Sequence, residues 1–196
     1  MIIGPSTGAQ PPVGYKRCVD NTLTDGPTTD NPAQSFDDLL TANRRYGEGF
    51  TLGGLPAPAR RGLAVVTCMD SRIEPLQMLG LVPGDAKIMR NAGARVTDDA
   101  LRSLILAVNL LNVSRIALVQ HTDCAMTKDS EDGLRAKVSA AAGADASDWT
   151  FLTTADQEGA LREDVARLAA CPLVASDVMV GGFIYDVDTG LLRRVA

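Results

Sequence analysis

Two short apolar runs constrain the fold more than any other feature of this 196-residue chain. Residues 63–68 (LAVVTC) and 115–120 (RIALVQ) are almost continuously apolar and rich in β-branched side chains. Such runs are typical of strands that are buried on both faces, as in parallel sheets covered by helices. Helical patterns lie between and after the two runs. This alternation predicts an α/β domain with a mostly parallel central β-sheet flanked by helices.

The other elements follow from periodicity and from the residues that begin and end helices. The clearest helix spans 97–111, where Thr97 is the predicted N-cap, two aspartates follow, and apolar residues recur at helical spacing. A helix is also predicted from Ser35 onward, with Ser35 as its N-cap. The remaining predicted elements are helices over 74–81 and 156–171, and strands over 86–90, over 178–186 and ending at Val195.

Residues 1–34 have a different composition from the rest of the chain. They contain five of the ten prolines and four glycines, and they show no apolar periodicity. This composition predicts an extended or disordered N-terminal arm, which is either a free tail or a strap across a partner subunit. The folded domain is therefore expected to span residues 35–196.

Charge and composition exclude several classes of partner. The net charge is −5 and lysines and arginines form no cluster, which argues against binding to nucleic acid or to an anionic membrane surface. No apolar run approaches the roughly 18 residues of a membrane span, and the first residues lack the pattern of a secretory signal. Four cysteines in a chain of this kind favour a reducing compartment. A cytoplasmic location is expected.

Two motifs follow the ends of the two predicted buried strands. Cys68 ends the first strand, and His121 and Cys124 follow the second in the segment HTDC. Functional groups of open α/β sheets gather outside the carboxyl ends of strands, where the strand order reverses. If the two strands are neighbours there, the three side chains converge, and two thiolates with one imidazole favour Zn²⁺. We expect one zinc ion per chain, with a fourth position left open as in catalytic sites.

Asp70 and Arg72 extend the first motif to CMDSR. Asp70 is close enough to Cys68 either to bind the zinc ion or to stand beside a zinc-bound water. Arg72 is suited to hold that carboxylate in a bidentate pair and to keep it off the metal. An aspartate released from Arg72 would become a fourth ligand and close the site. The pair is therefore a hypothetical pH-linked switch.

The remaining candidates carry weaker signals. Cys18 lies in the arm and Cys171 precedes a proline, so both are interpreted as thiols without a metal role. The loop RNAGA at 90–94 either brings backbone N–H groups close to a small substrate or simply makes a tight turn. The glycine-rich phosphate-binding motifs and the CxxC redox motif are absent from the sequence.

Three segments together resemble the signatures of β-class carbonic anhydrases. They are CMDSR at 68–72, RNAGARVTDD at 90–99 and HTDCAM at 121–126, in the family's order. The resemblance covers about residues 36–196 and extends to a short bacterial branch that is also similar to carbonyl sulfide hydrolases. The site residues that it implies are the zinc ligands Cys68, His121 and Cys124, the catalytic pair Asp70 and Arg72, and the substrate-pocket residues Asn91, Ala92 and Gly93. It also implies a homodimer or higher oligomer, in which the first helix packs on the other subunit.

The resemblance implies reversible hydration of CO₂ to bicarbonate and a proton by zinc-bound hydroxide. Because two thiolates weaken the acidity of the metal, activity is expected to be highest at alkaline pH. Two alternatives remain: hydrolysis of carbonyl sulfide or carbon disulfide at the same site, and a non-catalytic zinc protein in which Asp70 is a permanent fourth ligand. Ala125 stands where the family usually has glycine. Its methyl group is expected to crowd the pocket or to shift the loop.

Overall fold

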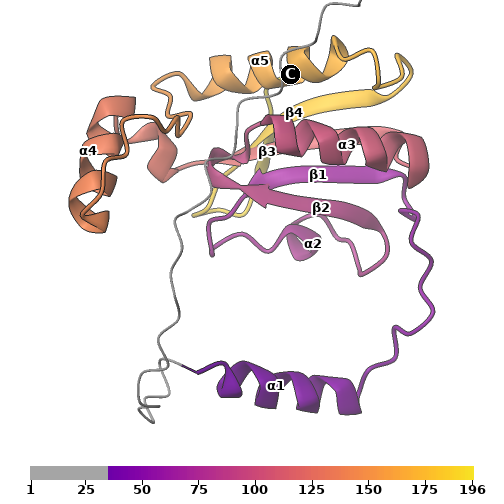
Figure 1. Cartoon of the computed structure of the whole chain (residues 1–196). Helices are drawn as coiled ribbons and strands as arrows, with labels where there is room; N and C mark the ends of the chain where they lie inside the picture. Colours follow the sequence, from indigo (N-terminus) through magenta and orange to yellow (C-terminus); the bar gives the residue numbers. More distant parts are fainter. Residues whose placement is uncertain (1–34) are drawn as a thin grey trace, which may run out of the picture. The chain divides into compact units, whose positions relative to one another are not determined.

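The computed structural model describes residues 35–196 (Figure 1), so the predicted arm over 1–34 lies outside the described residues. The chain divides into two units, with the boundary between Phe50 and Thr51. The described part of the first unit contains one helix, α1 (Asp37–Glu48). The second unit contains the sheet, the other helices and every residue predicted to form the site.

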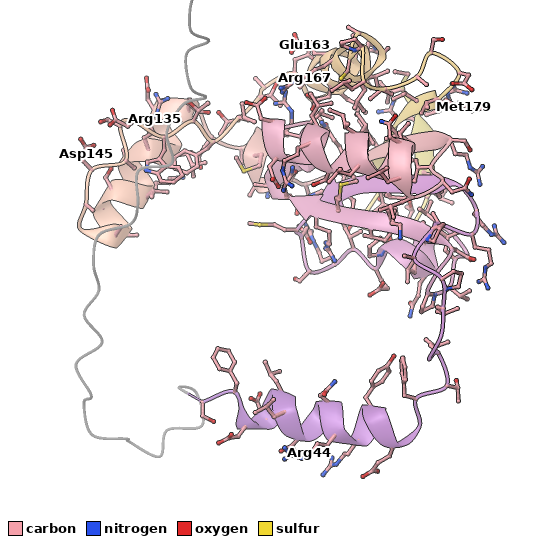
Figure 2. All side chains as sticks on the ribbon, turned by 45° about the vertical axis from the view of Figure 1, so that its right-hand side comes forward. Arg44, Arg135, Asp145, Glu163, Arg167 and Met179 are labelled. Carbon is pink, nitrogen blue, oxygen red and sulfur yellow. The ribbon has the colours of Figure 1, made fainter. Side chains whose placement is uncertain are left out.

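Helix α1 is amphipathic and none of its residues is buried. The large apolar side chains of this unit are 49% to 75% exposed: Phe36, Leu39, Leu40, Tyr46 and Phe50. Figure 2 shows aromatic rings along one side of α1, whereas Arg44 points to the opposite side. The prediction of Ser35 as N-cap was wrong by one residue. Phe36 is the N-cap and makes no side-chain capping hydrogen bond, whereas the Ser35 hydroxyl accepts a hydrogen bond from the N–H of Asp37.

Within residues 35–196, five strands form one sheet in the order β2-β1-β3-β4-β5. They are β1 (Leu63–Cys68), β2 (Ala86–Asn91), β3 (Arg115–His121), β4 (Met179–Tyr185) and β5 (Leu192–Arg194). The first four run parallel, and β5 pairs antiparallel with β4. The two apolar runs have become β1 and β3, which are neighbours in the middle of the sheet. The predicted α/β fold with a mostly parallel sheet is confirmed.

Helices cover both faces of the sheet. Figure 1 shows α3 (Asp98–Leu110) and α5 (Gln157–Ala169) on one face and α2 (Pro75–Met78) on the other. Right-handed crossovers require this division, because the chain moves from β1 to β2 in one direction and from β2 to β3 and β4 in the other. Thr97 caps α3 as predicted, since its side chain accepts a hydrogen bond from the N–H of Ala100. Across residues 35–196, no helix combines the length and apolar character that a bilayer span requires.

The main core lies between the sheet and the helices α3 and α5. Its fully buried members include Leu104 from α3, Leu118 from β3 and Leu161 from α5. Burial of each such side chain contributes about 1.5–3 kcal/mol. Gly182 in β4 permits close packing, because a Cβ atom there would lie 3.0 Å from Cγ of Leu161 and 3.2 Å from Cγ2 of Val165. The glycine therefore lets α5 lie directly against the sheet.

Helix α4 (Glu131–Ala142) was not predicted from the sequence. It lies beside the sheet and on neither face (Figure 1), and none of its residues is buried. A helix without a buried face needs no apolar stripe, so the sequence offers no helical period by which to predict it. Its ends nevertheless carry capping signals. The Ser130 side chain accepts a hydrogen bond from the N–H of Gly133, and Gly143 ends the helix with a φ of 64°. Short 3-10 helices complete the structure: η2 (Ala92–Ala94) and η3 (Ala125–Thr127).

The strand order reverses at the carboxyl ends of β1 and β3. These strands pair from Leu63 with Arg115 to Thr67 with Val119, so Cys68 and His121 come at the same edge of the sheet. From β1 the chain turns toward β2, and from β3 it turns toward β4. Such a reversal is where open α/β sheets place their ligand sites.

Candidate metal centre

Three side chains converge at this edge of the sheet. The candidate ligand atoms of Cys68, His121 and Cys124 all lie within 4.8 Å of one another. Cys68 is the last residue of β1, His121 is the last residue of β3, and Cys124 directly precedes η3. All three residues are at most 5% exposed. The structure therefore brings together the three residues that the two motifs predicted as a ligand set.

His121 is oriented as a metal ligand. Its Nδ1 lies 2.8 Å from the carbonyl oxygen of Thr122. A carbonyl only accepts, so Nδ1 carries the proton and Nε2 presents a lone pair. Nε2 is buried and has no hydrogen-bond partner among the described residues. An unpaired buried nitrogen is costly unless something binds it, and a metal ion among the three donors would do so.

The two cysteines share a hydrogen bond that favours a thiolate. The hydrogen bond from Cys124 outweighs the effect of burial and, with contributions from His121 and from the backbone N–H groups of Asp70 and Gly93, lowers the pKa of Cys68 to about 3. The same contact and burial raise the pKa of Cys124. A thiolate is the form of cysteine that binds metal, so Cys68 is prepared as a ligand. Two sulfurs and one imidazole nitrogen fit zinc and not the hard cations magnesium and calcium.

Asp70 and Arg72 form a bidentate ion pair beside the ligand set. Nε of Arg72 lies 3.0 Å from Oδ1 of Asp70 and Nη2 lies 2.8 Å from Oδ2, while the backbone N–H of Arg72 donates to Oδ1 at 2.9 Å. The side-chain hydrogen bonds from Arg72 hold the pKa of Asp70 well below its usual range, and Asp70 in turn raises the pKa of Arg72. Oδ2 of Asp70 lies 3.8 Å from Nε2 of His121. The carboxylate is therefore ionised, fixed and adjacent to the ligands.

Asp123 is a further charged residue at this site, and it was not among the predicted site residues. Its Oδ2 lies 2.8 Å from Nη1 of Arg72, and its Oδ1 lies 2.5 Å from Nζ of Lys128. Hydrogen bonds from Lys128 and Arg72 hold the pKa of Asp123 below its usual range. The backbone of Asp123 has a φ of 57°, a left-handed conformation that aspartate tolerates. In the sequence, only its place within HTDC marks it.

Arg90 holds the backbone between Cys68 and Asp70. Its Nε donates to the carbonyl oxygen of Cys68 at 2.9 Å, and its Nη2 donates to the carbonyl oxygen of Asp70 at 2.5 Å. In the sequence Arg90 begins the predicted loop RNAGA and has no predicted role of its own, whereas in the structure it lies within β2. The role depends on strand pairing, which sets Asn91 opposite Cys68 and so brings Arg90 alongside the end of β1.

The three predicted pocket residues lie at the end of β2 and just after it: Asn91 is the last residue of the strand, and Ala92 and Gly93 begin η2. Oδ1 of Asn91 accepts the N–H of Arg95 at 2.8 Å, and Nδ2 of Asn91 donates to the carbonyl oxygen of Arg95 at 2.7 Å. Asn91 therefore closes the loop with its side chain. Gly93 has a φ of 74°, and its N–H donates to Sγ of Cys68 at 3.4 Å. Ala92 is half-buried between them.

Cys171 and Ala125 lie outside the ligand group. Cys171 is half-buried against the main core and is not among the described residues grouped as candidate metal ligands. Cys18 falls outside the described residues. Ala125 is exposed, and it is not one of the described non-glycine residues with positive φ. The backbone at Ala125 therefore does not require glycine.

Known proteins match this chain over most of its length. The carbonic anhydrase family model matches residues 63–192. Beta-carbonic anhydrase 1 of Mycobacterium tuberculosis is 36% identical over 159 residues, which are 81% of this chain and 96% of that protein. A carbonic anhydrase structure from Streptococcus mutans has a TM-score of 0.78 at 41% identity and covers 82% of this chain and 97% of its own. A carbon disulfide hydrolase of Acidianus is 35% identical over 161 residues, 70% of this chain and 78% of that protein. Matched in sequence and in fold, this chain belongs to the β-carbonic anhydrase family.

Proposed function

We propose that the protein catalyses the reversible hydration of CO₂ to bicarbonate and a proton, using one zinc ion per chain. The observation that carries this proposal is the buried group Cys68, His121 and Cys124 with an ionised carboxylate beside it. Zinc held by these three residues would supply a water activated for attack near neutral pH. Relatives named as carbonic anhydrases support the same activity.

Asp70 is assigned to orient the reacting water. An ionised carboxylate can only accept hydrogen bonds, so a water or hydroxyl next to Oδ2 must point its hydrogen toward Asp70. Its oxygen lone pair is then directed away from the carboxylate, toward the substrate carbon. Arg72 keeps Asp70 charged and in place through both carboxylate oxygens. Because both oxygens are engaged in this way, we do not propose Asp70 as a permanent fourth ligand.

The surroundings of the ligands suit a small uncharged substrate. Ile73, Ala94 and partly buried Met126 and Tyr185 pack in one apolar cluster with the two cysteine ligands. Such a wall excludes bulk water and strengthens the electrostatic interactions inside it. The only histidine of the chain is in the ligand group, so protons must leave through carboxylates or buffer and not through a histidine shuttle.

Hydrolysis of carbon disulfide or carbonyl sulfide is the second candidate function. The Acidianus relative named carbon disulfide hydrolase favours it specifically, at 35% identity. These substrates resemble CO₂ in offering an electrophilic carbon between two terminal atoms. The same activated water and the same Asp70–Arg72 pair would serve, and the space around the substrate sulfur would decide the preference.

Stopped-flow measurement of proton release from CO₂ at about pH 8.5 tests the proposal on the zinc-loaded full chain. Arg72→Ala is expected to lower kcat at least about a hundredfold while zinc is retained, because Asp70 loses its partner. Arg102→Ala is the matched control, since Arg102 also pairs with a nearby aspartate, Asp99 at 2.6 Å, on the exposed side of α3. Turnover of carbon disulfide without turnover of CO₂ would favour the second candidate function. Turnover of neither substrate would overturn both candidate functions.

We also propose that a second copy of the chain covers the apolar side of α1. The support is that this helix has no buried residue although it carries several large apolar side chains. Burying each of them would contribute about 1.5–3 kcal/mol. In sedimentation velocity, the wild type is expected to run as a dimer or larger species, and Leu40→Glu is expected to shift it toward monomer. Arg44→Glu, on the opposite side of α1 (Figure 2), is the control. A monomeric wild type would contradict the proposal.

A further inference from the structure

Arg72 has carboxylate partners on two different loops. Its Nε and Nη2 bind Asp70, which follows β1. Its other partner is Asp123, which follows β3. Nη1 of Arg72 donates to Oδ2 of Asp123 at 2.8 Å, and Nη2 lies 3.3 Å from the carbonyl oxygen of Asp123. All three guanidinium nitrogens are therefore engaged. The plane of the guanidinium is set by both carboxylates together.

Asp123 is itself held in place. It lies between the two candidate ligands His121 and Cys124, so its backbone moves only with the ligand loop. Lys128 binds the carboxylate oxygen that Arg72 leaves free, with Nζ 2.5 Å from Oδ1. The contacts thus run in series from Lys128 through Asp123 and Arg72 to Asp70.

These contacts contribute little to folding. The side chains of Arg72, Asp123 and Lys128 are 43%, 51% and 57% exposed. Ion pairs exposed to this extent contribute little to stability, because water screens them. The Asp123 carboxylate instead restricts the motion of the Arg72 side chain. Without Asp123, Nη1 of Arg72 would face water, and the exposed side chain would be free to swing about its remaining partner.

We propose that Asp123 is a positioning residue, which holds the Arg72 guanidinium in the plane of the Asp70 carboxylate, and that Lys128 holds Asp123 in turn. This inference rests on the proposed function, in which Asp70 orients the reacting water. Neither Asp123 nor Lys128 contacts the reacting atoms. They act by setting the orientation of the Asp70 carboxylate toward the reacting water. A small misplacement of such a group slows a reaction strongly.

Variants of the zinc-loaded full chain test the positioning role. Asp123→Ala is expected to lower kcat about tenfold with KM little changed. Asp123→Asn keeps an oxygen acceptor for Nη1, so it is expected to restore most of that loss, and Lys128→Met is expected to lower kcat about threefold. Asp129→Asn is the control, because Asp129 is a neighbouring acid that pairs with Lys137 at 2.7 Å and not with Arg72. A wild-type kcat in Asp123→Ala would overturn the proposal.

A double-mutant cycle separates positioning from a general structural effect. If Asp123 acts through Arg72, then Asp123→Ala is expected to change kcat by less than about twofold when Arg72 is already alanine. The same tenfold loss in both backgrounds would mean that Asp123 acts by another route, and the proposal would fail.

The exchange rate of the Arg72 Nε–H with solvent, measured by nuclear magnetic resonance with and without zinc, gives a test that needs no turnover. Asp123→Ala is expected to speed this exchange about tenfold, since the side chain loses a charge-assisted hydrogen bond, and Asp129→Asn is expected to leave it unchanged. Unchanged exchange in Asp123→Ala would overturn the positioning role. Faster exchange in a protein that turns over neither CO₂ nor carbon disulfide would support the role and overturn only the proposed function.

Discussion

Gly93 donates its backbone N–H to Sγ of Cys68 at 3.4 Å, so the loop after β2 supports a candidate ligand that belongs to β1. Gly93 also lies close to Met126, because a Cβ atom on Gly93 would be 3.3 Å from Cγ of Met126. Met126 follows shortly after Cys124. A single glycine therefore contacts the surroundings of both sulfur ligands, and such supporting hydrogen bonds influence how tightly a metal is held.

Gly93→Ala is expected to weaken zinc binding about tenfold, because the added methyl group pushes against Met126 and moves the N–H away from Cys68. The φ of 74° adds backbone strain of about 1–2 kcal/mol. Gly143→Ala is the matched control, since Gly143 has a φ of 64° but no atom within 4 Å of its Cβ position. Competition with a chelator measures zinc affinity, and urea unfolding measures stability. Equal zinc affinities in the two variants would contradict the role of Gly93.

Cys124→Ser is expected to reduce zinc content to below about a tenth of an ion per chain after dialysis against a chelator, because serine cannot supply a thiolate. Cys171→Ser is the control, as its sulfur lies against the main core and outside the ligand group. Metal analysis by atomic emission provides the measurement. Full zinc retention in Cys124→Ser would remove Cys124 from the ligand set.

Asp164→Ala is expected to destabilise the protein by about 3–5 kcal/mol, because it leaves the charge of Arg95 buried without its carboxylate partner. Nε of Arg95 lies 2.7 Å from Oδ2 of Asp164, and the two side chains are only 13% and 6% exposed. Asp99→Ala, which breaks an exposed ion pair with Arg102, is expected to cost less than about 1 kcal/mol. Urea unfolding compares the two. Similar losses would show that burial does not distinguish these pairs.

Asp85→Asn is expected to destabilise the protein near neutral pH and to have progressively less effect as the pH falls. The N–H of Val82 and the guanidinium of Arg60 donate to the buried Asp85 carboxylate and hold its pKa below the usual range. Because the folded pKa lies below the unfolded value of about 3.9, the stability that the carboxylate contributes is present above that value and is lost as pH falls through the folded pKa. Urea unfolding from pH 7 to pH 3 checks this, and a constant difference between variant and wild type would contradict it.

The sequence predicted those elements whose signals are local. Thr97 with its two following aspartates began a helix in the predicted place, since capping depends on neighbouring residues. Helix α4 was missed because it has no buried face from which to read a period, although Ser130 and Gly143 mark its ends. Ser35 had the right chemistry for an N-cap, yet Phe36 took that position. Serine is a much better N-cap than phenylalanine, so the start of this helix follows the backbone geometry and not the cap propensity, and such boundaries commonly shift by one or two residues.

The sequence by itself determined the α/β class, the two central strands and the residue types of the metal group, because strand burial and donor chemistry are properties of short segments. Only the tertiary structure decided which groups support those donors. Arg90 reaches the carbonyl oxygens of Cys68 and Asp70 because β2 lies beside β1, and Asp123 reaches Arg72 because β3 lies on the other side of β1. Contacts between residues far apart along the chain depend on strand order and register, which no local pattern encodes.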